Sequence, residues 1–187
     1  RMLAYSSVAH AGYMLLAMPV MSGDSIYAIM VYLVMYLFMN LGAFFVVITI
    51  KNKTNGETFD DYKGLGWEMP IVGITMTLFM VSLTGLPPTA GFIGKFYIFA
   101  SLIQGGGSFY WLVVIGGINS VVSLYYYLRV VKVMYFDGDR KDSLVSPPKV
   151  LTGMLLVTAV PTMLLGIYWV PLAQWIQKSL VFFIQTI

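Results

Sequence analysis

The chain has 187 residues, of which 59% are hydrophobic and only 10% charged, and its formal net charge is +3. Soluble domains carry roughly 25% charged residues, so this composition excludes an ordinary soluble fold. The small net charge, without a run of lysine and arginine, argues against nucleic acid as a partner. Cysteine is absent and histidine occurs once, which argues against disulfides and against bound metal or haem.

The first third of the chain predicts two membrane-spanning helices and a polar loop. An apolar segment over about residues 2–20 ends at the turn Ser22-Gly23-Asp24, and a second covers about 26–50. Each is long enough for a helix to cross a bilayer, which takes ~20 apolar residues. Residues 51–68 form a polar loop of mixed charge.

Residues 69–104 form the most informative stretch, apolar throughout but interrupted by Gly85-Leu86-Pro87-Pro88. As one straight helix it would be ~50 Å long, against a hydrocarbon core of ~30 Å. The prolines Pro87 and Pro88 remove two backbone donors, and Gly85 gives the chain freedom to bend. We therefore predict a broken helix with an unwound middle, a feature that marks ion pathways in transporters.

The remaining segments predict two further spans. An apolar segment covers about 109–136 and is followed by a charged loop over 137–149. The last span is predicted at about 150–170, with an amphipathic or interfacial tail from Pro171. The fold class is therefore an all-α polytopic membrane protein with about five transmembrane helices, one of them discontinuous.

The distribution of basic residues favours one interrupted crossing over two short ones at residues 69–104. With one crossing, most of the basic residues share one side of the membrane: Arg1, Lys51, Lys53, Lys63, Lys132, Arg140, Lys141 and Lys149. With two crossings this asymmetry disappears. Because positive residues collect on the cytoplasmic side, we expect loops 51–68 and 137–149 to be cytoplasmic.

Lys95 is the leading candidate for a functional residue. It lies in Gly91-Phe92-Ile93-Gly94-Lys95-Phe96, too far from either end of its span to reach the headgroups easily. An ammonium at this depth costs several kcal/mol on insertion scales, so such residues are functional candidates by default. The alternative is a structural lysine that bonds the backbone carbonyls freed by the break.

Two further polar residues lie inside predicted spans, and both have a structural alternative. His10 is interpreted as an imidazole hydrogen-bonded between helices, with a proton-relay role as the alternative. Asn40 is interpreted as an interhelical hydrogen-bonding group that could also hold water in a proton wire. No carboxylate falls inside a predicted span, so an acidic partner for Lys95 has to come from another segment or chain. No catalytic triad, phosphate loop or dinucleotide fingerprint is present, and we expect neither a metal site nor a bound cofactor.

Several strings together resemble the antiporter-like membrane subunits of respiratory complex I, the proton-pumping NADH:quinone oxidoreductase, and among them subunit N. They are Arg1-Met2-Leu3-Ala4-Tyr5-Ser6-Ser7, His10-Ala11-Gly12-Tyr13, Asn40-Leu41-Gly42-Ala43-Phe44, Lys63-Gly64-Leu65-Gly66, Leu86-Pro87-Pro88-Thr89-Ala90-Gly91-Phe92-Ile93-Gly94-Lys95-Phe96 and Leu124-Tyr125-Tyr126-Tyr127-Leu128-Arg129-Val130. The resemblance covers nearly the whole chain and weakens after Pro148. Sibling subunits carry a lysine where this chain has Asn40, so the resemblance points to subunit N.

The resemblance implies a longer subunit built from two inverted five-helix repeats, each with one broken helix. Residues 1–149 would form most of the second repeat, and 150–187 the last helix and tail. We therefore expect the C-terminal part of a longer protein, as the apolar start at Arg1 also suggests. The family's proton-translocating lysine corresponds to Lys95. The chain would then be a translocase subunit in the bacterial cytoplasmic membrane, without a redox site of its own. FMN, iron–sulfur clusters and quinone would belong to other subunits, and its partners would be further membrane-arm subunits, lipid and protons.

Three alternatives stay open at this point. The first is the corresponding subunit of a photosynthetic-type complex with ferredoxin as its electron donor. The second is a stand-alone cation/proton antiporter, and the third a structural scaffold subunit in which Lys95 only bonds the broken backbone.

Overall fold

The computed structural model describes residues 1–138 and 144–186, and these residues form α-helices and short 3₁₀ turns without any strand. The α-helices are α1 (Met2–Ala17), α2 (Gly23–Thr54), α3 (Leu65–Glu68), α4 (Pro70–Thr84), α5 (Ala90–Gln104), α6 (Tyr110–Tyr135), α7 (Lys149–Ile167) and α8 (Val170–Thr186). The 3₁₀ turns are η1 (Met18–Val20), η2 (Phe59–Tyr62) and η3 (Gly107–Phe109). The predicted all-α membrane fold is confirmed. Arg140 and Lys141 of the predicted second loop lie outside the described residues.

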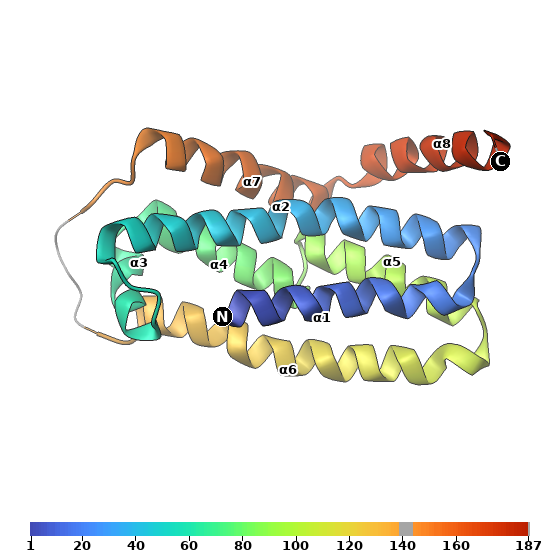
Figure 1. Cartoon of the computed structure of the whole chain (residues 1–187), viewed down its shortest axis with the longest axis horizontal. Helices are drawn as coiled ribbons and strands as arrows, with labels where there is room; N and C mark the ends of the chain where they lie inside the picture. The colour runs from blue at the N-terminus through green and yellow to red at the C-terminus, as the bar shows by residue number, and fades with distance from the viewer. Residues whose placement is uncertain (139–143, 187) are drawn as a thin grey trace.

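Three helical segments of the described chain are long and apolar enough to cross a membrane: Gly23–Thr54, Gly107–Tyr135 and Lys149–Ile167. Helices α4 and α5 have 15 residues each, or ~22 Å, and neither alone matches a core of ~30 Å. In Figure 1 they follow one another along the bundle, separated by residues 85–89. This arrangement agrees with one interrupted passage.

Helix α2 forms the centre of the bundle and packs against α1, α4, α5 and α7. It begins earlier than predicted, because Ser22 caps it: the Ser22 hydroxyl accepts the Ser25 N–H, and the Ser25 hydroxyl accepts the Ser22 N–H, both at 3.1 Å. Such a capping box satisfies two backbone donors at a helix start. Gly23 and Asp24, predicted in a turn, therefore belong to the helix.

The two ends of the bundle differ in charge. Figure 1 places the loop with α3, the end of α6 and the start of α7 at one end, and the α1–α2 and α5–α6 connections at the other. Lys51 and Lys53 lie in the last turn of α2, which extends to Thr54 and so into the predicted 51–68 loop, and Lys63 lies in the connection that follows. The single-passage topology therefore brings the basic segments to one end, as the charge argument required.

The C-terminal segment forms a helix of its own. Residues from Val170 onward build α8, and Figure 1 shows α7 and α8 one after the other along the same side of the bundle. Ala173 and Ile176 of α8 are buried, and Ile176 packs in one cluster with Val31 and Met35 of α2. The predicted tail thus lies against the bundle.

Candidate functional site

The break between α4 and α5 follows directly from its sequence. A helical carbonyl bonds the N–H four residues later, and Pro87 and Pro88 have none, so the carbonyls of Leu83 and Thr84 lose their partners. Gly85 ends α4 with φ +89°, a left-handed conformation that favours glycine. The freed Thr84 carbonyl then becomes an acceptor in the middle of the bundle.

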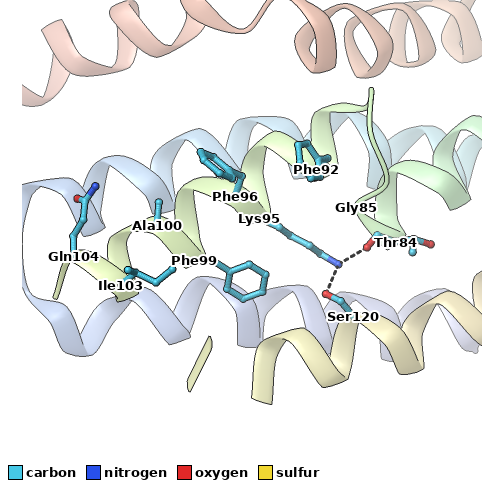
Figure 2. A pocket seen from close by; sticks show the side chains of 10 residues that line it. All are labelled: Thr84, Gly85, Phe92, Lys95, Phe96, Phe99, Ala100, Ile103, Gln104 and Ser120. Carbon is cyan, nitrogen blue, oxygen red and sulfur yellow. Dashed lines mark hydrogen bonds between the residues drawn. The ribbon is translucent and has the colours of Figure 1, made fainter. Parts of the chain in front are cut away.

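Lys95 supplies the donor for that carbonyl. Its Nζ donates to the Thr84 oxygen at 2.8 Å and to the Ser120 hydroxyl of α6 at 3.2 Å, as Figure 2 shows. It also lies 4.5 Å from the ring centroid of Tyr13 in α1. Only 5% of Lys95 is exposed. The ammonium thus joins the break to two other helices, a set of contacts that agrees with the structural alternative.

Glycine makes the close approach of Lys95 to the break feasible. A Cβ added to Gly85 would lie 2.8 Å from the Lys95 Cδ, closer than real Cβ contacts come. A Cβ on Gly91, in the first turn of α5, would overlap the backbone oxygen of Ser82. The Gly91 N–H instead donates to the Ser82 hydroxyl at 3.1 Å. The end of α4 and the start of α5 are therefore locked in close contact.

Tyr13 connects Lys95 to a row of neutral polar groups on α6. Its Oη donates to the Gly116 carbonyl at 3.1 Å and shares a 2.7 Å hydrogen bond with the Ser120 hydroxyl. The Asn119 amide lies at 3.4 Å from the same oxygen. Ser120 is therefore a hydrogen-bond partner of both Lys95 and Tyr13 and links the two residues.

His10 forms the second part of the same polar region. It is 1% exposed, and its Nδ1 and Nε2 bond the hydroxyls of Tyr32 at 2.6 Å and Tyr127 at 3.1 Å. Tyr127 in turn bonds the Ser6 hydroxyl. The His10 ring lies 5.9 Å from the Tyr13 ring, one turn away on α1. Lys95 and His10 are thus brought near each other through Tyr13, and His10 is hydrogen-bonded to residues of two other helices.

Asn40 is placed differently. Its Oδ1 is buried and finds no hydrogen-bond partner within residues 1–138 and 144–186. It lies on α2 one turn from Tyr36, whose ring stacks on His10 with centroids 5.0 Å apart. Asn40 is therefore near the polar region but is not bonded into it, and a buried amide oxygen of this kind is suited to binding water.

A cavity of about 440 Å³ reaches Lys95 from the side. Figure 2 shows it following α5 from the break toward Gln104, with the Lys95 side chain at one end. Its lining residues are Thr84, Gly85, Phe92, Lys95, Phe96, Phe99, Ala100, Ile103, Gln104 and Ser120. Most of this wall is apolar. The cavity therefore gives Lys95 a second approach, which meets the hydrogen-bonded region that leads to His10 at Ser120.

The partners Tyr13, Tyr32, Tyr127 and Ser120 were not predicted as site residues. One signal was present, because Tyr13 stands three residues after His10 and so falls on the same helix face. Ser120 carries no such signal. It is 25 residues from Lys95 in sequence and becomes a neighbour only through packing.

Among the described residues, no ion pair involves Lys95. Within the same part of the chain, no group of histidine, aspartate or glutamate is suited to hold a metal ion. The polar groups that this site brings together are an amine, an imidazole and several hydroxyls.

The fold and the site define a polytopic helical membrane protein with a proline-broken span and a buried lysine at the break. Residues 1–123 match the family model described as NADH:quinone oxidoreductase/Mrp antiporter, transmembrane. The chain belongs to this family.

Relatives named NADH-quinone oxidoreductase subunit N match nearly the whole chain. NADH-quinone oxidoreductase subunit N 2 of Sorangium cellulosum is 50% identical over 181 residues, which cover 96% of this chain and 36% of that protein. Subunit N of Chlorobium chlorochromatii is 45% identical over 183 residues, with the same coverage. The chain thus spans a little over a third of the length of these relatives.

Solved structures agree on the fold. A chain of respiratory complex I from Thermus thermophilus with bound aureothin aligns with a TM-score of 0.70 and 30% identity, covering 88% of this chain and 37% of that one. A chain of an archaeal membrane-bound sulfane sulfur reductase aligns with a TM-score of 0.82 over 95% of this chain and 36% of that one. Its identity is 23%, so this second likeness concerns the fold alone.

Proposed function

We propose that this chain is part of a proton-translocating, subunit N-type component of NADH:quinone oxidoreductase and that Lys95 carries the proton. The observation that carries the proposal is the placement of Lys95 at the broken helix, in contact with Thr84, Ser120 and Tyr13. The similarity to relatives named NADH-quinone oxidoreductase subunit N supports NADH as the donor of the whole complex.

In this mechanism Lys95 exchanges its proton with two different surroundings. On one side lies the cavity along α5 toward Gln104. On the other lies the region of Tyr13 and His10, whose groups can accept and donate hydrogen bonds, with Ser120 between the two. A change in hydration or in nearby charge would shift Lys95 between loading and release. His10 would relay protons, and Asn40 would hold water in the wire.

The redox chemistry belongs, in this proposal, to other subunits that hold FMN, iron–sulfur clusters and quinone. The chain would lie in the bacterial cytoplasmic membrane beside further membrane-arm subunits, with loops 51–68 and 137–149 on the cytoplasmic side. Its own contribution would be to couple quinone reduction to proton transfer.

The test is Lys95→Gln in the full-length subunit within the assembled complex. Glutamine keeps an N–H donor for the Thr84 carbonyl but cannot carry a proton. We expect normal assembly with loss of the protons pumped through this subunit, measured in inverted membrane vesicles. The matched control is Lys132→Gln, since the side chain of Lys132 is 68% exposed near the end of α6. Lys95→Arg, which stays protonated, should also fail to pump.

One observation favours a second candidate, a scaffold role for Lys95. The 2.8 Å bond from its Nζ to the Thr84 carbonyl satisfies a group that the break leaves without a helical partner. Full pumping in Lys95→Gln would establish this alternative and would exclude the proposed proton-carrying role.

A further inference from the structure

The junction between α7 and α8 is a second interruption of a helical segment, and it lies against the break between α4 and α5. Helix α7 ends at Ile167 and α8 begins at Val170, and Tyr168 between them leaves the helical conformation with φ −128° and ψ 73°. In Figure 1 this junction falls at a similar position along the bundle as the junction of α4 and α5. Gly166 touches that break directly, since a Cβ on Gly166 would overlap the Pro88 carbonyl oxygen. The two interruptions are therefore in contact.

A side-chain hydrogen bond joins the second interruption to the helix that carries Lys95. The Trp169 indole Nε1 donates to the Tyr97 hydroxyl of α5 at 3.2 Å. The Tyr97 ring also packs edge-on against Tyr27 of α2, with centroids 5.5 Å apart. All three aromatic residues pack around the buried apolar cluster of α2, α5 and α8. The bond is thus partly shielded from competing water.

Tyr97 and Lys95 project from opposite sides of α5. They are two residues apart, and a helix advances ~100° per residue, so their side chains diverge by ~200°. Lys95 is held by Thr84 and Ser120 on one side, and Tyr97 is held by Trp169 on the other. A rotation or shift of α5 that changes the surroundings of Lys95 has to strain or break the Trp169–Tyr97 bond.

We propose that Trp169 is a positioning residue for Lys95: through its hydrogen bond to Tyr97, the α7–α8 junction holds α5 in the register that places Lys95 at the break. Gly166 allows the same junction to abut Pro88 and so fixes the distance between the two interruptions. The inference rests on the proposed function only in taking Lys95 as the proton carrier.

The first test measures the placement of Lys95 without relying on pumping. The chain contains no cysteine, so Lys95→Cys in the full-length subunit of the assembled complex gives a single reactive thiol in this segment. Its labelling rate with a water-soluble maleimide is compared in the Trp169→Phe and Trp175→Phe backgrounds. Trp175 is the matched control, because it lies on α8 with 64% of its surface exposed.

We expect Trp169→Phe to raise the labelling rate about fivefold, the factor that one net hydrogen bond contributes to an equilibrium constant. Trp175→Phe should leave the rate unchanged. Tyr97→Phe removes the acceptor of the same bond, so it should raise the labelling rate as much as Trp169→Phe does. The double variant should show no further increase in this rate. Equal rates in the Trp169→Phe and Trp175→Phe backgrounds, or additive effects of the two bond-removing variants, would overturn the proposal.

The second test keeps Lys95 and measures the protons translocated per electron pair in vesicles with equal amounts of assembled complex. A merely structural role for Trp169 would lower the amount of complex and leave this ratio unchanged. Positioning predicts a lower ratio in Trp169→Phe and Tyr97→Phe, and a normal ratio in Trp175→Phe. A normal ratio in all three variants, in a complex whose Lys95→Gln variant does not pump, would refute it.

The two proposals fail in different ways. If Lys95→Gln pumps normally while Trp169→Phe still changes the labelling rate, the proton-carrying role of Lys95 is wrong and the mechanical link between the interruptions stands. If Lys95→Gln abolishes pumping while Trp169→Phe changes neither labelling nor ratio, the link is wrong and the proton-carrying role stands.

Discussion

Gly85→Ala is the substitution whose effect on the stability of the subunit follows most clearly from the structure. Gly85 has φ +89°, and a left-handed conformation costs a residue with a side chain about 1–2 kcal/mol. The new methyl group would also lie 2.8 Å from the Lys95 Cδ. Carbon atoms in good contact are ~3.5–4.0 Å apart, so the lysine side chain has to move by about 0.7 Å or more.

That movement acts on the bond between Lys95 Nζ and the Thr84 carbonyl, which is 2.8 Å long. A shift of this size takes it out of the range of a good hydrogen bond, and bonds to charged groups contribute about 1.5–3 kcal/mol. We therefore expect Gly85→Ala to destabilise the subunit by about 3 kcal/mol in total. The assay is the thermal midpoint of the full-length assembled complex together with proton pumping in vesicles.

Two comparisons separate the backbone cost of Gly85→Ala from the cost of displacing Lys95. Gly117→Ala in α6 is the matched control, because a Cβ there meets no atom within 4 Å and alanine favours a helix by up to about 1 kcal/mol. In the Lys95→Ala background, Gly85→Ala should retain only the backbone cost of about 1–2 kcal/mol. If Gly85→Ala behaves like Gly117→Ala in both stability and pumping, the argument about this break is wrong.

Three further predictions concern the helix contacts around the site. Gly91→Ala should cost at least about 3 kcal/mol, because the methyl group would overlap the Ser82 carbonyl oxygen; an undiminished yield of assembled complex would contradict this. Tyr127→Phe removes a partner of His10 and should lower stability by about 1 kcal/mol and slow pumping, with the pumping rate as the measurement. Ser22→Ala removes the α2 cap and should lower the thermal midpoint by the equivalent of about 1 kcal/mol, while pumping per complex stays normal.

The broken helix and Lys95 could be predicted because their physics is local. Adjacent prolines remove donors wherever they occur in a helix, and a lysine in apolar sequence is costly enough to stand out. The length of residues 69–104 and the placement of the basic residues then selected one interrupted passage. These inferences need only the spacing along the chain.

The partners of Lys95 could not be predicted, because they depend on how distant helices pack. Tyr13 and Ser120 are 107 residues apart in sequence yet share a 2.7 Å hydrogen bond. Serine and tyrosine are common in membrane helices, so neither residue type identifies a site. The position of α8 could not be predicted either, because Ile176 is buried only through its packing against α2 and α5.

The neutral lining of the site has an electrostatic consequence. The groups that contact Lys95 are a carbonyl, a hydroxyl and an aromatic ring, and none of the ion pairs within the described ranges includes it. Within the described residues no counter-ion contacts Lys95, so charges farther away act on it without competition from an adjacent ion pair. At an effective dielectric constant of ~20, a unit charge 10 Å distant acts on it with about 1.7 kcal/mol. That energy changes a protonation equilibrium more than tenfold. In the proposed mechanism, a charge that moves in a neighbouring helix would therefore shift the balance between the protonated and neutral forms of Lys95.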